Sequence, residues 1–120
     1  MEDLGTVLRS RYPDMVTLLS KIRERPGMFL GRPTISGLHL FLNGISFAED
    51  YYSLKDRITG FDWDRFEQWI EHRFNPRKLS LGSFGLAREN ANDEESGFDL
   101  WFAWYDEFRS LETEVSERSE

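Results

Sequence analysis

The segment from Phe98 to Phe108 constrains the fold more than any other part of the sequence. Its aromatic residues recur at intervals of three and four, the period of an α-helix. They are Phe98, Trp101, Phe102, Tyr105 and Phe108, with Leu100, Trp104 and Leu111 beside them. An apolar band this wide indicates a helix buried on more than one side, at the centre of a bundle, and we expect Trp101 and Phe108 to be buried. Asn92 and Glu95 have the spacing of a capping box, which predicts the start of this helix.

Three further segments show the same period. The first covers residues 12–25, and the second begins at a cap provided by Thr34 or Ser36. The third extends from a cap at Asp62 to the stop signal Asn75-Pro76. Their apolar positions are, in chain order, Met15, Leu18, Leu19 and Ile22; Leu38, Phe41, Ile45, Ala48 and Tyr52; and Phe66, Trp69, Ile70 and Phe74.

The connection at residues 76–91 lacks a clear period. Residues 79–86 fit either a short strand or a single helical turn, and their glycines and serines favour an irregular, packed connection. We therefore predict an all-α fold, with one domain over residues 1–120 and a bundle of about four main helices. The polar tail from about residue 112 is expected to fray.

Composition restricts the chemistry and the compartment. The chain has 120 residues and no cysteine, so disulfides and thiolate metal sites are excluded. Its first residues contain two acids and no apolar run, unlike a signal peptide, and no stretch reaches the eighteen apolar residues of a membrane span. We expect a cytoplasmic protein with no membrane partner.

The net charge of −7 is unevenly distributed. Eleven acids and two arginines between Glu89 and Glu120 give that segment a charge of −9, which leaves +2 for residues 1–88. Because nucleic acids bind through Lys and Arg, an acidic segment disfavours direct nucleic-acid binding. It would attract a basic protein partner. Solubility alone is the other explanation of this charge.

No residue pattern indicates a catalytic or metal site. His39 and His72 lie on different predicted helices, without the H-E-x-x-H spacing of a zinc site, and no serine lies in a G-x-S-x-G motif. Asp99, Asp106 and Glu107 lie at the edges of an amphipathic helix, where solvated carboxylates are expected. We therefore predict no catalytic residue, no metal and no cofactor, with a small hydrolase using carboxylates of the last helix as the alternative.

The stretch "IRERPGMFLGRPTISGLHLFL", beginning at Ile22, resembles the start of the ATPase domain of DNA gyrase B and related type II topoisomerases. In that family the following helix carries a catalytic glutamate and a magnesium-binding asparagine. The corresponding positions here are Gly44 and Ala48, which can neither activate water nor bind a metal. The sequence thus predicts no ATPase. Gly44 costs about 1 kcal/mol of helix propensity relative to alanine, which predicts that a neighbouring backbone packs closely there.

A second resemblance covers more of the chain. The pieces "RPGMFLG", "PTISGLHLFLNGISFAEDYY", "FEQWIEHRF" and "EESGFDLWFAWYDEF" resemble small bacterial immunity proteins of polymorphic toxin and contact-dependent inhibition systems. The resemblance implies a non-enzymatic protein that neutralises a cognate toxin by binding it. The matching motifs are structural. Within "RPGMFLG" we expect Pro26-Gly27 to form a type II turn, with positive φ at the glycine.

The predicted partner-binding residues lie in the acidic segment: Asp93, Glu94, Glu95, Asp99, Asp106 and Glu107. Helix capping and the helix dipole explain the first three, because acids stabilise a first helical turn. Asp106 and Glu107 lie too far along the helix for that, so a basic toxin domain or simple solubility must explain them. A regulatory adaptor that binds another protein is a further alternative.

Overall fold

The computed structural model describes residues 3–118, and within that range the chain forms seven helices and no strand. The helices are α1 (Leu4–Arg11), α2 (Met15–Glu24), α3 (Pro26–Leu30), α4 (Ile35–Tyr51), α5 (Trp63–Phe74), α6 (Ser83–Glu89) and α7 (Glu94–Arg118). The all-α prediction is confirmed. The four predicted main helices correspond to α2, α4, α5 and α7, whereas α1, α3 and α6 are too short to show a period in the sequence.

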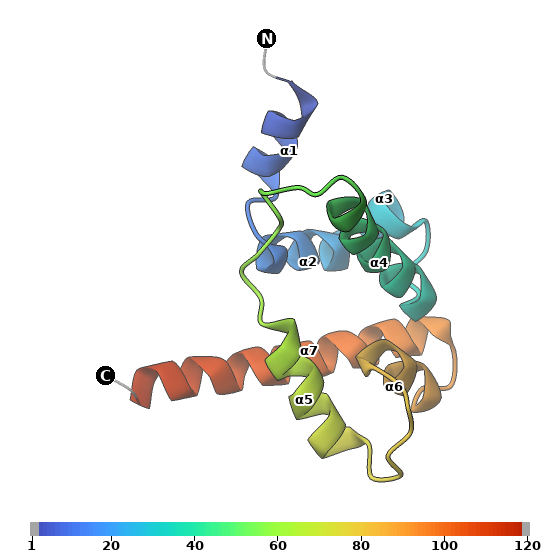
Figure 1. Ribbon diagram of the computed structural model, residues 1–120. Coiled ribbons are helices and arrows are strands. Elements are labelled where there is room, and N and C mark those ends of the chain that lie inside the picture. The colour runs from blue at the N-terminus through green and yellow to red at the C-terminus, as the bar shows by residue number, and fades with distance from the viewer. Residues whose placement is uncertain (1–2, 119–120) are drawn as a thin grey trace.

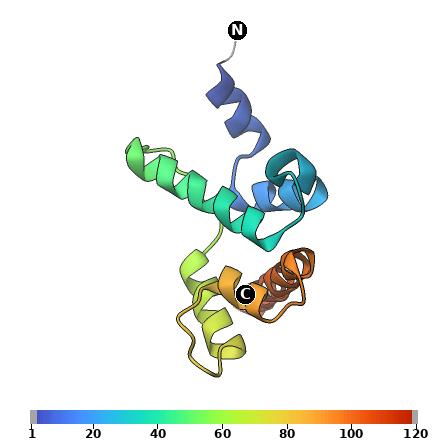
Figure 2. The same cartoon turned by 90° about the vertical axis from the view of Figure 1, so that its right-hand side faces the viewer.

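Helix α7 packs on helices of two groups. Figures 1 and 2 show α2, α3 and α4 together in the upper part of the molecule and α5 and α6 beside α7 in the lower part, with α4 contacting both α6 and α7. Helix α1 projects from the globule and contains no buried residue. The central position of α7 follows from its wide aromatic band, which gives both groups an apolar surface to pack on.

The predicted core is largely confirmed. Trp101 is fully buried and Phe108 is nearly so, and each predicted helix contributes its apolar stripe to a single cluster. Aromatic side chains from α5, α6 and α7 meet there: Phe66 packs edge-on to Trp101 at 5.4 Å, and Phe84 stacks on it at 5.2 Å. Tyr52 was wrongly assigned to this core. It lies just beyond the end of α4 and is 69% exposed.

Two of the three predicted helix starts are confirmed at atomic level. Thr34 accepts a hydrogen bond from the Gly37 amide at 3.0 Å, and Asp62 accepts one from the Arg65 amide at 3.0 Å. The predicted capping box of α7 is wrong, because the cap is Asp93, whose carboxylate accepts the Ser96 amide at 2.7 Å. Asparagine and aspartate are equally good caps, so adjacent positions compete and packing decides between them.

The segment Pro26–Leu30 forms the short helix α3, so the predicted type II turn is wrong. Proline is favoured at the first helical position because its fixed φ already suits a helix, and Pro26 occupies that position. Gly27 therefore does not adopt positive φ. The left-handed residue is Gly31, with φ of 80°, which ends α3 and redirects the chain toward α4.

The irregular connection predicted at 76–91 is correct only in its first part. Residues 76–82 contain no regular helix, but α6 begins at Ser83, so 79–86 forms neither a strand nor a single turn. At the other end of the chain, α7 continues to Arg118, beyond the point at residue 112 where we expected a frayed tail.

Candidate functional site

Two of the six acids predicted to bind a partner serve helix ends within the chain. Asp93 caps α7. Glu94 reaches the start of α4, where its carboxylate accepts the Ser36 amide at 2.9 Å, and it lies 3.4 Å from the Arg88 guanidinium. Glu94 thus joins the first turns of α4 and α7, and this is a contact between helices that the sequence alone does not reveal.

We expect the contribution of Glu94 to the stability of the fold to depend on pH. The hydrogen bonds from Ser36, together with the charge of Arg88, lower the pKa of Glu94. A carboxylate with a lowered pKa stabilises the folded state above its unfolded pKa, and this contribution is lost as the pH falls through the folded pKa. We expect Glu94→Gln to lower the melting temperature near neutral pH and to have no effect in acid, where the native side chain is itself protonated.

Thermal unfolding followed by circular dichroism from about pH 7 to about pH 3 measures this effect, since the unfolded Glu pKa is about 4.3. Glu114→Gln, an exposed change on the same helix, is the matched control. An equal loss of stability at both ends of the pH range would show that the carboxylate charge of Glu94 plays no part.

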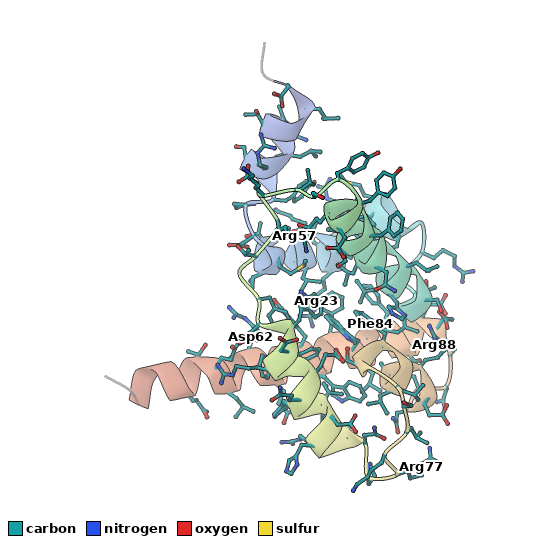
Figure 3. The ribbon with its side chains drawn as sticks, viewed as in Figure 1. Arg23, Arg57, Asp62, Arg77, Phe84 and Arg88 are labelled. Atoms are coloured by element: carbon teal, nitrogen blue, oxygen red, sulfur yellow. The ribbon has the colours of Figure 1, made fainter. Side chains whose placement is uncertain are left out.

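Three more of the predicted acids form ion pairs with arginines of other segments. The pairs are Glu95 with Arg32 at 2.6 Å, Asp106 with Arg23 at 2.7 Å, and Glu107 with Arg73 at 2.7 Å. Arg23 also lies over the Phe102 ring at 5.1 Å. Figure 3 shows Arg23 beside α7 and Arg88 at the end of α6, so the arginines approach from different elements.

The acidic segment is therefore largely neutralised by the chain itself. Counting all ion pairs of residues 89–114, seven arginines face its carboxylates. These internal partners explain the charges of Asp106 and Glu107 without an external one. Of the six predicted acids, Asp99 alone has neither an ion pair nor a capping role within the described residues.

A concave site lies between α5 and α6. It is a cleft of about 670 Å³. Its lining residues are Glu67, Gln68, Ile70, Glu71, His72, Asn75, Pro76, Lys78, Leu81, Gly82, Ser83 and Leu86. Ile70, Leu81 and Leu86 supply apolar surface, and seven of the twelve lining residues are polar or charged. Binding sites combine apolar surface with polar groups that orient a ligand.

Two carboxylates one turn apart on α5 line this cleft. Glu67 accepts the Ser83 amide at 2.7 Å and so satisfies the start of α6. Glu71 accepts an N–H of Asn75 at 2.8 Å. Asn75 in turn exchanges two hydrogen bonds with the Leu79 backbone, at 2.7 and 2.9 Å. These bonds hold both carboxylates and the connecting loop in fixed positions around the cleft.

Unlike the acids of α7, Glu67 and Glu71 form no ion pair with any described residue. Each keeps oxygen lone pairs for an incoming donor. The nearly fully buried Ile70 and Leu86 provide apolar walls beside them. A Lys or Arg side chain has the matching chemistry, because its aliphatic stem packs on apolar surface while its cationic head binds carboxylate.

The sequence analysis did not identify Glu67 and Glu71. Their four-residue spacing was visible in the sequence, but the spacing alone does not show what lies opposite them. What makes them a site is the opposing wall, which comes from α6 and its preceding loop. That wall could not be anticipated while residues 79–86 were unassigned.

His39 and Ser83, residue types that often take part in catalysis, contact aromatic side chains of the fold. His39 stacks on Phe84 with ring centroids 4.6 Å apart, and burial, followed by the charge of Arg88, lowers its pKa. Ser83 is fully buried and accepts the Trp101 indole N–H at 2.9 Å. Among the residues that the structure describes, no group of three or more His, Asp and Glu side chains is placed to hold a metal ion.

None of the described helices combines the length and the apolar character needed to cross a membrane. Comparisons of the chain with protein-family models, with curated proteins and with solved structures found no match.

Proposed function

We propose that the chain is a non-enzymatic protein-binding module, of the immunity type that the sequence resembles, which neutralises a bacterial toxin by binding it. The observation that carries this proposal is the cleft between α5 and α6, where Glu67 and Glu71 are fixed in position but have no cationic partner in the described chain. The cognate surface is a basic protein segment that inserts a Lys or Arg side chain between them.

Binding is favoured over hydrolysis because most of the predicted carboxylates of the last helix already have partners, Asp99 being the exception. A general acid or base must be free to exchange a proton with a substrate. Glu94 and Glu107 instead bind arginines of other elements, and Glu94 also holds a backbone amide. A regulatory adaptor would use the same cleft and would differ only in the identity of its partner.

The acidic face of α7 is the second surface that we propose for a partner. Its ion pairs are exposed, and exposed pairs contribute only about 0–1 kcal/mol. A basic partner can therefore replace Arg23 at Asp106 while also binding the unpaired Asp99. This surface has to exchange existing ion pairs, however, whereas Glu67 and Glu71 in the α5–α6 cleft have hydrogen-bond donors but no ion pair to displace.

The deciding experiment first expresses the product of the gene next to the one for this chain, and then measures its binding to the chain by surface kinetics at low and high salt. We expect Glu67→Gln/Glu71→Gln to weaken binding at least tenfold, because a carboxylate pair is lost while the amide oxygens still accept the same internal hydrogen bonds. Asp99→Asn/Asp106→Asn removes the same number of charges from α7 and tests the second proposed surface.

Each outcome has a distinct meaning. Loss of binding only in the α7 variant would move the interface to that helix. If both variants bind as tightly as the unmodified chain, neither acidic surface contacts the toxin. Absence of binding by the unmodified chain would reject the immunity function for this pair of proteins.

A further inference from the structure

Helix α4 has a second apolar face that packs on nothing in the described chain. Its core face contributes the buried Ile35, Leu38 and Leu42. On the opposite side Leu40, Phe47 and Tyr51 are 72%, 68% and 70% exposed. With Gly44 they follow the spacing 40, 44, 47 and 51, which is the a/d seam of paired helices. We call these four residues the outer seam.

The outer seam lies in the least charged part of the protein. Residues 35–48 contain no Asp, Glu, Lys or Arg, although 31% of the whole chain is charged. A solvated helix face normally carries charge, and contiguous exposed apolar surface marks interaction sites. The lack of charge also removes the repulsion that two copies of a chain with net charge −7 would otherwise experience at close contact.

Gly44 points to a partner outside the chain. A Cβ built at this position would meet no atom within 4 Å, so the close packing expected there from the sequence does not occur within the described chain. Glycine inside a helix costs about 1 kcal/mol relative to alanine. No contact within the described chain compensates for this cost. The absence of a side chain at Gly44 leaves a notch beside Phe47 and Leu40, which can receive a large side chain from another molecule.

We propose that a second copy of this chain occupies the outer seam, in an antiparallel pair of α4 helices related by a twofold axis. In such a pair the residue numbers that face each other have a constant sum. With a sum of 91, Leu40 faces Tyr51 of the second copy and Gly44 faces Phe47 of the second copy. The seam is therefore complementary to itself, since each Phe47 fills the notch at the other Gly44, as an isologous interface requires.

The exposed aromatic residues of the seam pack on one another. Phe47 stacks on Tyr51 with centroids 5.9 Å apart, and Tyr51 contacts Tyr52 edge-on at 5.0 Å. The following loop is tied to the end of α4, because Glu49 accepts the Ile58 amide at 2.7 Å and Asp50 pairs with Arg57. Arg57 is labelled in Figure 3 on this loop. A preordered surface loses less conformational entropy on association.

The exposed area of the seam is large enough for a dimer of weak to moderate affinity. Phe47 and Tyr51 of the seam, and Tyr52 that adjoins it and contacts Tyr51, are each more than two-thirds exposed, and an aromatic side chain buries about 200 Å². They thus offer on the order of 400 Å² per copy. When Leu40 and the helix backbone are added, the two copies together would bury about 1,000–1,200 Å² of surface. This area is near the lower limit of specific interfaces. We expect a reversible dimer that dissociates on dilution.

Sedimentation and light scattering of the full chain, from low micromolar to near-millimolar concentration, test the proposal. We expect a concentration-dependent dimer that Phe47→Glu abolishes by placing a charge in the seam. Met28→Glu is the matched control, because Met28 is a similarly exposed apolar residue (64%) on α3. Circular dichroism verifies that both variants fold. A monomer at every concentration, or a dimer unaffected by Phe47→Glu, would overturn the proposal.

Exchanging the small and the large residue of the contact between Gly44 and Phe47 tests the antiparallel pairing of the two copies. Gly44→Phe has open space in the single chain, but it would oppose Phe47 of the second copy and weaken the dimer at least tenfold. The double variant Gly44→Phe/Phe47→Gly again places one phenylalanine opposite one glycine, and we expect it to restore association. Failure of the double variant to recover, with folding intact, would reject the antiparallel arrangement.

Discussion

Replacing Trp101 by alanine is expected to lower the free energy of unfolding by about 3–5 kcal/mol, the usual cost of removing a buried tryptophan. Trp101 is fully buried at the centre of α7. Its ring stacks on Phe84 of α6 and on Tyr105 of its own helix, at 5.2 and 5.7 Å. Its indole N–H donates to Ser83 at 2.9 Å. The truncation thus opens a cavity where α5, α6 and α7 meet.

Chemical denaturation measures this loss, and two conservative variants separate its causes. Trp101→Phe keeps most of the packing but leaves Ser83 without its donor. Ser83→Ala keeps the ring but leaves a buried N–H unpaired, which typically costs about 1–3 kcal/mol. We expect both to be milder than Trp101→Ala. A Trp101→Ala protein that unfolds like the parent would mean that α7 turns a different face to the core.

Gly60→Ala is expected to destabilise the fold by about 2–3 kcal/mol, although it adds only a methyl group to an exposed loop. Gly60 has φ of 93°, in the left-handed region that costs other residues about 1–2 kcal/mol. A Cβ there would also lie 2.8 Å from the Cβ of Asp14, the residue that caps α2. The adjacent Thr59 carbonyl accepts the Met15 amide at 2.6 Å, so the loop cannot move away freely.

Gly27→Ala provides the control for this prediction. A Cβ at Gly27 meets nothing within 4 Å, and the residue lies in α3 with ordinary helical geometry. Alanine there is expected to be neutral or slightly stabilising, because it favours helix. Urea unfolding of both variants gives the comparison. Equal midpoints for the two would show that neither the positive φ nor the contact with Asp14 matters.

The interior of the main helices could be predicted because it depends on local rules. The apolar period of the last helix required burial on two sides, and Trp101 and Phe108 are buried accordingly. The caps at Thr34 and Asp62 were also predictable, because a short polar side chain before an apolar period bonds amides only three residues away. These features depend on residues that are close together in the sequence, so the sequence alone is enough to predict them.

The candidate sites could not be predicted, because they depend on which distant residues meet. Asp106 and Glu107 were read as free charges, yet each faces an arginine from another helix. Glu67 and Glu71 belong to no recognisable motif, yet α6 forms a wall opposite them and so makes a cleft. Charge sums over a segment do not show where the counter-charges of the rest of the chain will lie.

The sequence by itself determined the all-α class, the four long helices and the side of α7 that enters the core, because each follows from the spacing of apolar residues along one helix. Only the tertiary structure decided which carboxylates are neutralised, where a cleft opens and which apolar face of α4 remains uncovered. Helix α4 has apolar residues on two faces, and although its period assigned Leu38, Phe41 and Ile45 to the core, the period alone cannot say whether the other face is covered as well. That choice depends on α6 and α7, which come far later in the chain and bury Ile35 and Leu38 while leaving Leu40 and Phe47 exposed.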